Sequence, residues 1–422
     1  MRFQSCKMNS VWNGLSLPIL LIMFLCEFCS SEVVFLLLGG LSLYYLVKSK
    51  GIRTEMSGFY IYVFMLSCGF LMGMLHLKDT GYNFYAYIKH VYYVAFPFLM
   101  WYTGENITKK NKLFRGQVYR TIVMATAIFC IWDLANFAGA IVNFSEFSND
   151  SSKIYQFRSQ VGYGDYFAVI GLYMLLFFQK ELMLSKPIIW TGCLIHGLSV
   201  LVHFSRTALL MVLIFGMVTG ARMLQIQKEE LKLGQLLGAC LAACLMTGAV
   251  AIIFPEITKD FLFKIKNTFI EMSPFHDDWT LYRVSNSWRG YEAYCAFVRF
   301  DNADLLEKLF GGGFGATLDV FGFAYLVTTE ETLPFLHNGY FTQLMVFGVV
   351  GVIAMLAWFV SMWKAALTIR IVEDRVFVLG LVACIVCMTA VVGGPLFSPA
   401  VAQLLFLVAT VSCIELNENN NE

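Results

Sequence analysis

The sequence predicts an all-α polytopic membrane protein with about 12 transmembrane helices and one large, partly helical extracytoplasmic loop. Of its 422 residues, 58% are hydrophobic and only 14% are charged, whereas about a quarter of the residues of a soluble domain are charged. The mean hydropathy is +0.67, and apolar runs of membrane-spanning length recur along the chain. The net charge of +1 provides no basic face, which excludes a nucleic-acid-binding protein.

Twelve apolar runs are the expected spans, because a helix needs about 20 mainly apolar residues to cross a bilayer. The first run follows Arg2 and Lys7 and has no clear small-residue cleavage site, which favours a retained signal-anchor over a cleaved signal peptide. The runs are 11–29, 32–47, 58–76, 84–103, 121–141, 161–178, 187–204, 207–222, 235–254, 337–360, 376–393 and 399–415.

The distribution of Lys and Arg predicts that both termini are cytoplasmic. With the N-terminus inside, the cytoplasmic connections carry 18 of the 30 basic residues, and the short outer connections carry 5. The remaining 7 lie in one long loop between the ninth and tenth spans. Cytoplasmic loops are enriched in Lys and Arg, so this orientation is favoured, and it places the long loop on the extracytoplasmic side of the membrane.

The long loop divides the chain into three expected parts. Residues 1–254 hold transmembrane helices 1–9, residues 255–336 form the extracytoplasmic loop domain, and residues 337–422 hold transmembrane helices 10–12 with a short cytoplasmic tail. The loop has 12 acidic and 7 basic residues. Because a segment of this length rarely lacks structure in a compact protein, we expect helices at 288–300 and 304–310.

A glycine run follows the second of these loop helices. Its sequence, Gly311-Gly312-Gly313-Phe314-Gly315, lacks the preceding strand and the following Lys-Ser/Thr of a phosphate-binding loop. We therefore expect a tight turn after the helix. The alternative is that its backbone amides face an anionic ligand.

His337 is the first candidate for a chemical role. It opens the tenth span in the sequence Leu336-His337-Asn338-Gly339-Tyr340, followed by Gly348 and Gly351. A histidine at a membrane boundary is more often an ordinary interfacial polar group. However, a neutral imidazole near pH 7 can accept a proton from a sugar hydroxyl.

Arginines on the outer side are candidates for binding an anion. Arg206 lies in the tight connection after the seventh span, and Arg283 and Arg289 lie in the loop. Each could instead be a membrane anchor or a solvated helix residue. Together they suit a diphosphate, because guanidinium binds phosphate oxygens bidentately. No metal site is expected, since the acidic run at His276 is more typical of a polar loop.

Aromatic side chains of the loop have two interpretations. Trp288 and Tyr291 could stack on sugar faces, or they could pack the loop onto the membrane helices. A transporter or flippase of lipid-linked glycans also remains open as an alternative function, because twelve spans are common in that class. Such proteins usually show two related halves and ionisable residues near the midplane, and neither feature is evident here.

These features resemble the O-antigen ligase and O-antigen polymerase family of bacterial membrane glycosyltransferases. The resemblance covers the topology of the whole chain, with its motifs in 204–207 and 282–352. Its most specific element is Leu336-His337-Asn338-Gly339-Tyr340-Phe341 with the two glycines beyond. The family is similar to the helical glycosyltransferases called GT-C and needs neither metal nor nucleotide, so the resemblance implies a GT-C-like fold without cofactors.

The resemblance also implies partners and roles. The donor would be a glycan on undecaprenyl diphosphate, and the acceptor a glycan or a lipid A core, in the bacterial cytoplasmic (inner) membrane alongside membrane lipids and other polysaccharide-assembly proteins. His337 matches the family's base and Arg206 its first diphosphate-binding arginine. Arg289 is preferred as the second, with Arg283 as the alternative, and Asn338 is a candidate glycan contact. Ligase and polymerase differ only in acceptor, and both stay open.

Overall fold

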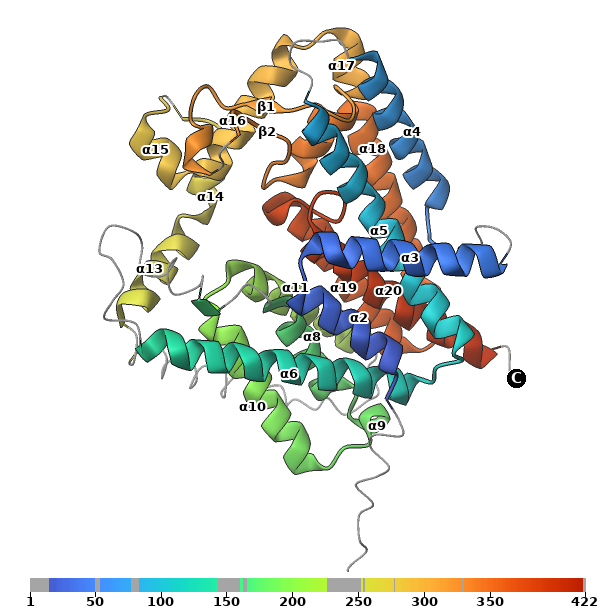
Figure 1. Cartoon of the computed structure of the whole chain (residues 1–422). Coiled ribbons are helices and arrows are strands. Elements are labelled where there is room, and N and C mark those ends of the chain that lie inside the picture. The colour runs from blue at the N-terminus through green and yellow to red at the C-terminus, as the bar shows by residue number, and fades with distance from the viewer. Residues whose placement is uncertain are drawn as a thin grey trace, which may run out of the picture.

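The computed structural model describes residues 15–49, 54–76, 83–142, 160–161, 165–225, 252, 255–276, 278–327 and 330–419. Within these ranges the chain is almost entirely helical, as expected for an all-α membrane protein (Figure 1). The helices before the long loop are α2 (Leu17–Phe28), α3 (Ser31–Ser49), α4 (Phe59–Leu75), α5 (Phe84–Lys110), α6 (Arg115–Val142), α8 (Asp165–Phe177), α9 (Gln179–Leu182), α10 (Lys186–Val202) and α11 (Arg206–Gln225).

The loop contains short helices and a small antiparallel sheet, and three long helices follow it. The loop elements are α13 (Pro255–Lys266), α14 (Thr268–Glu271), α15 (Leu281–Asn286), α16 (Trp288–Asn302), α17 (Leu305–Phe310), β1 (Leu318–Asp319), the 3-10 helix η2 (Ala324–Leu326) and β2 (Thr332–Leu333). The final helices are α18 (Gly339–Leu367), α19 (Val372–Val392) and α20 (Pro399–Asn419). The expected loop helices at 288–300 and 304–310 are thus confirmed as α16 and α17.

Four of the described helices are long and apolar enough to cross a membrane, namely Ser31–Lys48, Arg115–Val142, Gly339–Leu367 and Val372–Val392. Helices also occupy the other expected spans, except for 235–254, of which only residue 252 is described. The helices pack closely: α5 lies along α20, α4 along α18, and α10 along α8. Apolar side chains between them form one extensive core.

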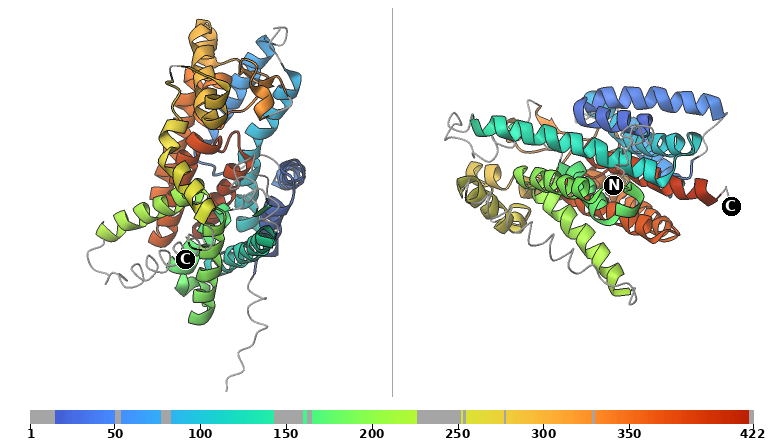
Figure 2. Two further views of the ribbon diagram at one scale, coloured as in Figure 1. Left: turned by 90° about the vertical axis from the view of Figure 1, so that its left-hand side faces the viewer. Right: turned by 90° about the horizontal axis from the view of Figure 1, so that it is seen from below.

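The loop elements gather at one side of the molecule. Figure 1 shows α14–α16 and the strands at the upper left and α17 at the top beside α4 and α18, whereas the α5–α6 connection and the C-terminal end of α20 lie at the lower right. The turned view in Figure 2 (left) again places α14–α17 at one end of the long helices. Elements α14–α17 therefore lie at one end of the long helices, and α17 packs directly on α18 and α4.

A break at Gly348 divides α18. Gly348 has φ 64° and ψ −165°, and Gln343 Nε2 donates to the Gly351 carbonyl at 3.0 Å. In a straight helix two residues eight apart would be separated by about 12 Å. The expected span 337–360 is therefore present as α18 but is kinked at Gly348, where a side chain would overlap the Leu309 carbonyl of α17. The expected close approach of a neighbour to this glycine is confirmed.

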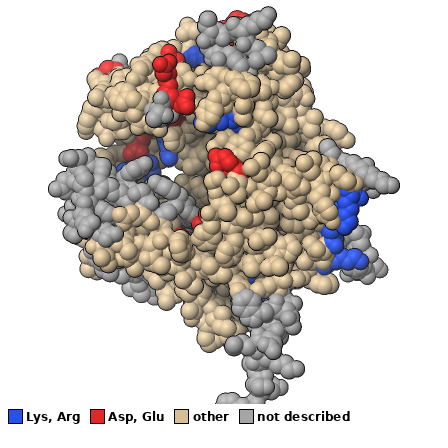
Figure 3. Space-filling view, viewed as in Figure 1, with Lys and Arg blue, Asp and Glu red and all other residues tan. Residues whose placement is uncertain are grey.

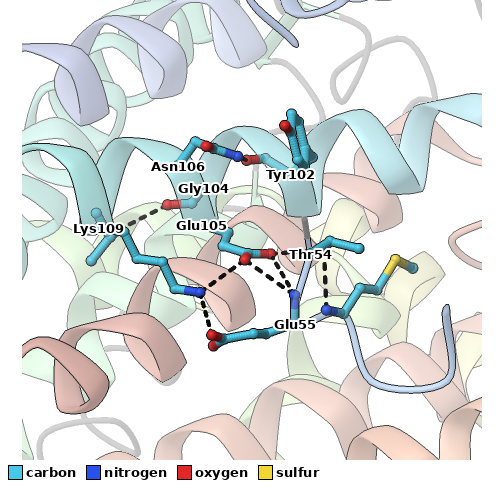
Figure 4. A network of polar contacts seen from close by, with 9 residues as sticks. Thr54, Glu55, Tyr102, Gly104, Glu105, Asn106 and Lys109 are labelled. Carbon is cyan, nitrogen blue, oxygen red and sulfur yellow. Dashed lines mark hydrogen bonds and ion pairs between the residues drawn. The ribbon is translucent and has the colours of Figure 1, made fainter. Parts of the chain in front are cut away.

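A buried carboxylate connects two segments of the membrane helices at the side opposite the loop. The Glu105 carboxylate, 2% exposed, accepts hydrogen bonds from Thr54 Oγ1 at 2.8 Å, the Glu55 amide at 3.1 Å and Lys109 Nζ at 2.9 Å (Figure 4). Buried charges require such partners, because desolvation without them costs several kcal/mol. This network joins the segment before α4 to the end of α5.

Candidate active site

His337 and Glu292 form a hydrogen-bonded pair between α18 and the loop. The carboxylate of Glu292, on α16, accepts from the His337 backbone amide at 3.0 Å and lies 3.0 Å from His337 Nδ1. Trp288 Nε1 donates to the same carboxylate at 2.6 Å. Glu292 is 3% exposed, so three donors compensate the cost of burying its charge.

This arrangement fixes the roles of the two imidazole nitrogens. An ionised carboxylate only accepts hydrogen bonds, so Nδ1 of His337 carries a proton toward Glu292. Nε2 then presents its lone pair on a side chain that is 46% exposed. The imidazole is oriented and accessible, which are the requirements for a general base.

Helix α16 is held in place by contacts along its whole length. Near its start, Gly290 lies so close to the end of α14 and the residues after it that a side chain would overlap the Ser273 carbonyl oxygen. In the middle, the buried Tyr291 hydroxyl donates to the Val320 carbonyl at 3.0 Å. Near its end, Arg299 pairs with Glu307 at 2.6 Å. Glu292 is therefore carried by a well-supported helix.

The glycine run joins the loop domain to the membrane helices. Gly311, Gly313 and Gly315 all have positive φ, as a tight turn requires. Gly312 donates its amide to the Met345 carbonyl at 3.0 Å, Gly313 to that of Val346 at 2.9 Å, and Phe314 to that of Gly69 at 2.9 Å. The expected turn is confirmed. The alternative that these amides bind an anion is wrong, because the protein itself uses them.

His90 of α5 connects this membrane helix to two segments of the loop. Its Nε2 lies 2.8 Å from the Pro334 carbonyl, so it donates there, and its Nδ1 accepts the Gly315 amide at 3.1 Å. Both segments that flank the β1–β2 hairpin are therefore tied to one side chain. Phe335 packs edge-on against the His90 ring, 5.1 Å between centroids. This contact fixes the chain two residues before His337.

Arg206 is bound to the loop rather than to open solvent. Its Nη1 donates to Glu271 at 2.8 Å, to Thr268 Oγ1 at 3.0 Å and to the Lys264 carbonyl at 3.0 Å. Glu271 ends α14, which packs on α16 beside Gly290. A chain of direct contacts thus leads from Arg206 through α14 to the helix that carries Glu292.

The two loop arginines differ in their surroundings. Arg283 pairs with Asp278 and keeps a side chain that is 40% exposed. Arg289 lies on α16 three residues before Glu292, so both project from the same face of that helix. This placement favours Arg289 over Arg283 as a group near His337.

The three candidate glycan contacts have structural partners. Tyr291 is 2% exposed and packs between Trp279 and Phe323, which favours the packing interpretation of this residue over a glycan contact. Asn338 caps α18 by accepting the Tyr340 amide at 3.0 Å. Trp288 is partly exposed and donates to Glu292, so it remains next to His337.

A cysteine nucleophile and a metal site are two other kinds of chemistry that this region could provide. Burial raises the pKa of the Cys295 thiol, on α16, to about 12, so this thiol is no nucleophile near pH 7. Among the described residues, no group of three or more His, Cys, Asp or Glu side chains gathers as a metal site would require.

Charged side chains are unevenly distributed over the surface of the molecule. On the face shown in Figure 3, several acidic side chains lie at the upper left beside a hollow in the surface, with a few basic ones near them, and another acidic group lies near the centre. Basic side chains form a separate group at the right edge, and most of the remaining surface is uncharged. Many exposed side chains of the helices are large and apolar, as is typical of a chain that faces lipid.

Glu292 and His90 are the important residues that the sequence interpretation missed. Trp288 and Glu292 are four apart on one helix, which could have suggested a paired Trp and carboxylate. Their partners lie 45 and 244 residues away in sequence, beyond the reach of any local pattern. Comparison with protein-family models and with curated proteins finds no match to this chain.

Proposed function

We propose that this chain is a membrane glycosyltransferase of the O-antigen ligase or polymerase type. It would move a glycan from undecaprenyl diphosphate to an acceptor hydroxyl at the outer face of a bacterial cytoplasmic membrane. The single observation that carries the proposal is the pairing of His337 Nδ1 with the buried Glu292 carboxylate at 3.0 Å, where the loop meets α18. This pairing leaves an accessible, oriented base at a membrane-helix end.

The proposed reaction needs one base. His337 Nε2 takes the proton of the acceptor hydroxyl as its oxygen attacks the anomeric carbon. The bond from that carbon to the diphosphate oxygen breaks, and its electron pair leaves with the diphosphate. The imidazolium that forms is stabilised by Glu292, so this interaction is stronger in the transition state than before it. The leaving group is already ionised and requires no acid.

The arginines would hold the diphosphate. Arg206 is occupied by Glu271 at 2.8 Å, so the donor must compete with that carboxylate for the guanidinium. Both side chains are partly exposed, at 25% and 20%, and solvent weakens such pairs. A diphosphate carries more charge than one carboxylate and can therefore replace it. Arg289, on the face of α16 that carries Glu292, would bind the other phosphate.

Reconstituted transfer tests the proposal. Purified protein in proteoliposomes is given a lipid-linked glycan and an acceptor, and glycan transfer is measured for wild type and His337→Ala. The proposal expects transfer by the wild type and a loss of at least about a hundredfold in the variant. His276→Ala, which removes an imidazole from the same loop, serves as the matched control and should retain activity.

The same assay separates the proposal from the transporter alternative. A transporter would move the intact donor between leaflets without releasing undecaprenyl diphosphate. The variant His337→Ala would then leave the rate of donor movement unchanged. Wild-type transfer rates in a stably folded His337→Ala protein would eliminate the proposed base.

A further inference from the structure

A cavity separate from the His337–Glu292 pair lies among α2, α6, α8 and α20. Its volume is about 330 Å³, at the lower end of the range of about 300–1,000 Å³ for small-molecule sites. Its walls come from the C-terminal end of α2, the second half of α6, and the first turns of α8 and α20. By the charge pattern of the connections, all four of these helix ends face the outer side, where the loop domain lies.

The polar part of the wall consists of acids and amides. Glu27 and Asp133 supply carboxylates, and Asn136 and Gln403 supply carboxamides. Asp133 is buried and accepts the Ser199 hydroxyl at 3.0 Å, which orients its carboxylate. None of the described residues that line the cavity is Lys or Arg. A phosphate or another anion is therefore disfavoured there by the two carboxylates.

The rest of the wall is formed by aromatic side chains together with Cys26, Val161 and Ala400. Trp132 and Tyr166 line the cavity, and the Trp132 ring packs edge-on against Phe28 with 5.9 Å between centroids. Trp132 is 54% exposed, so part of its indole faces outward. Rings of this kind offer flat apolar faces, while their N–H and O–H groups seek polar partners.

This combination of groups fits a sugar. Carboxylate and amide oxygens accept hydrogen bonds from hydroxyl groups, and amide nitrogens donate to them. Gln403 Nε2 donates to the Cys26 carbonyl at 3.2 Å, which holds the amide in position and leaves its oxygen to accept. Aromatic faces cover the apolar C–H face of a pyranose ring. A simple cation would need no aromatic walls.

Helix α20, whose first turn lines the cavity, is connected to a turn that packs against Gly339. Helix α20 follows the turn 393–398, and the Gly393 carbonyl lies so close to Gly339 that a side chain there would overlap it. Gly339 is two residues after His337, and Gln403 is one turn into α20. One short stretch of chain therefore lies between the cavity and the proposed base.

We propose that this cavity binds an uncharged sugar residue, as part of the glycan that the protein transfers. The inference rests on the proposed function for the identity of that glycan. The sugar would sit between the carboxamides of Asn136 and Gln403, with Trp132 along its apolar face.

Binding of simple glycosides tests the inference without any transfer reaction. The full chain is placed in lipid nanodiscs, prepared without glycoside detergents because these would compete. Methyl glycosides of glucose, galactose, mannose and N-acetylglucosamine are examined by saturation-transfer NMR, with inorganic phosphate as an anionic probe in competition. We expect at least one glycoside to bind saturably and phosphate not to displace it.

Variants locate the bound glycoside. Asn136→Leu and Gln403→Leu should each weaken binding roughly tenfold, since each removes hydrogen bonds to the sugar. Asn106→Leu is the matched control, because Asn106 does not line the cavity. Its amide donates to the Tyr102 carbonyl near the C-terminal end of α5. It should leave glycoside affinity unchanged.

The outcomes distinguish this inference from the proposed function. Absence of saturable glycoside binding, equal binding by Asn136→Leu and Gln403→Leu, or displacement by phosphate would overturn the sugar site. Glycoside binding by a protein that shows no transfer would support the cavity and refute the proposed enzyme. Normal transfer without glycoside binding would support the proposed enzyme and refute the sugar site.

Discussion

Replacement of Glu292 by Gln is the most informative change in the protein. The side chain keeps its shape, so Trp288 Nε1 can still donate to the amide oxygen. The amide nitrogen, however, is a donor. It would replace the carboxylate oxygen that accepts the His337 backbone amide at 3.0 Å and lies 3.1 Å from His337 Nδ1, so it would oppose both N–H groups. The imidazole would then carry its proton on Nε2, the nitrogen that must be free to act as base.

The size of the effect follows from what the carboxylate contributes. A hydrogen bond to a charged group contributes about 1.5–3 kcal/mol, so loss of imidazolium stabilisation alone lowers the rate roughly 10- to 150-fold. A wrong tautomer adds to this, and in serine proteases the corresponding change lowers kcat by about 10⁴. We therefore expect Glu292→Gln to reduce kcat between about 10² and 10⁴, with little change in KM for the donor.

The assay is the initial rate of undecaprenyl diphosphate release in proteoliposomes, with the melting temperature measured in parallel. Glu307→Gln is the control, since it changes a carboxylate that pairs with Arg299 at 2.6 Å in the same domain. It should stay within about threefold of wild type. Since Glu292 acts through His337, the double variant with His337→Ala should be no slower than His337→Ala alone. A folded Glu292→Gln protein with wild-type kcat would refute the reasoning.

The remaining predictions concern the arginines and the break in α18. Arg206→Lys keeps the charge but loses the planar fork, so kcat/KM for the donor should fall at least about tenfold, and equal values would contradict the diphosphate role. Arg289→Ala should lower the same parameter more than Arg283→Ala, and the opposite order would exchange their roles. Gly348→Ala places a side chain at φ 64° against Leu309, so we expect a destabilisation of about 1–3 kcal/mol or more, detected as a lower melting temperature. An unchanged melting temperature would show that the break is not required.

The sequence predicted the helices well because their signal is local. A run of about 20 apolar residues leaves few alternatives to a buried helix, and the loop helices α16 and α17 were marked by their flanking polar and glycine residues. Asp304, whose side chain accepts the Glu307 amide at 2.8 Å, caps α17 at its expected start. Such features depend on residues only a few positions apart.

The break in α18 could not be predicted from the same signal. Glycine within an apolar run is compatible with a continuous helix that neighbours approach closely. What interrupts the helix is the packing of Leu309 and Gly311 against Gly348, and these come from a segment almost 40 residues earlier. Tertiary contact decides the conformation here, and local propensity does not.

The site was predictable only in part for the same reason. His337 was identified from its boundary position, but an acidic residue in an acidic loop gives no sign that it is buried, so Glu292 was not singled out. The pairing of Arg206 with Glu271 joins positions 65 apart in sequence. Residue types could suggest the chemistry, whereas the partners that orient each group are set by the fold.

The most direct measurement counts products in a single turnover. Wild-type protein and His337→Ala are each mixed in excess with a labelled lipid-linked glycan and an acceptor, and free undecaprenyl diphosphate and glycosylated acceptor are quantified together. The account predicts one undecaprenyl diphosphate released for each glycan transferred by the wild type, and neither product from the variant on the same timescale. Equal product formation by both proteins would contradict it.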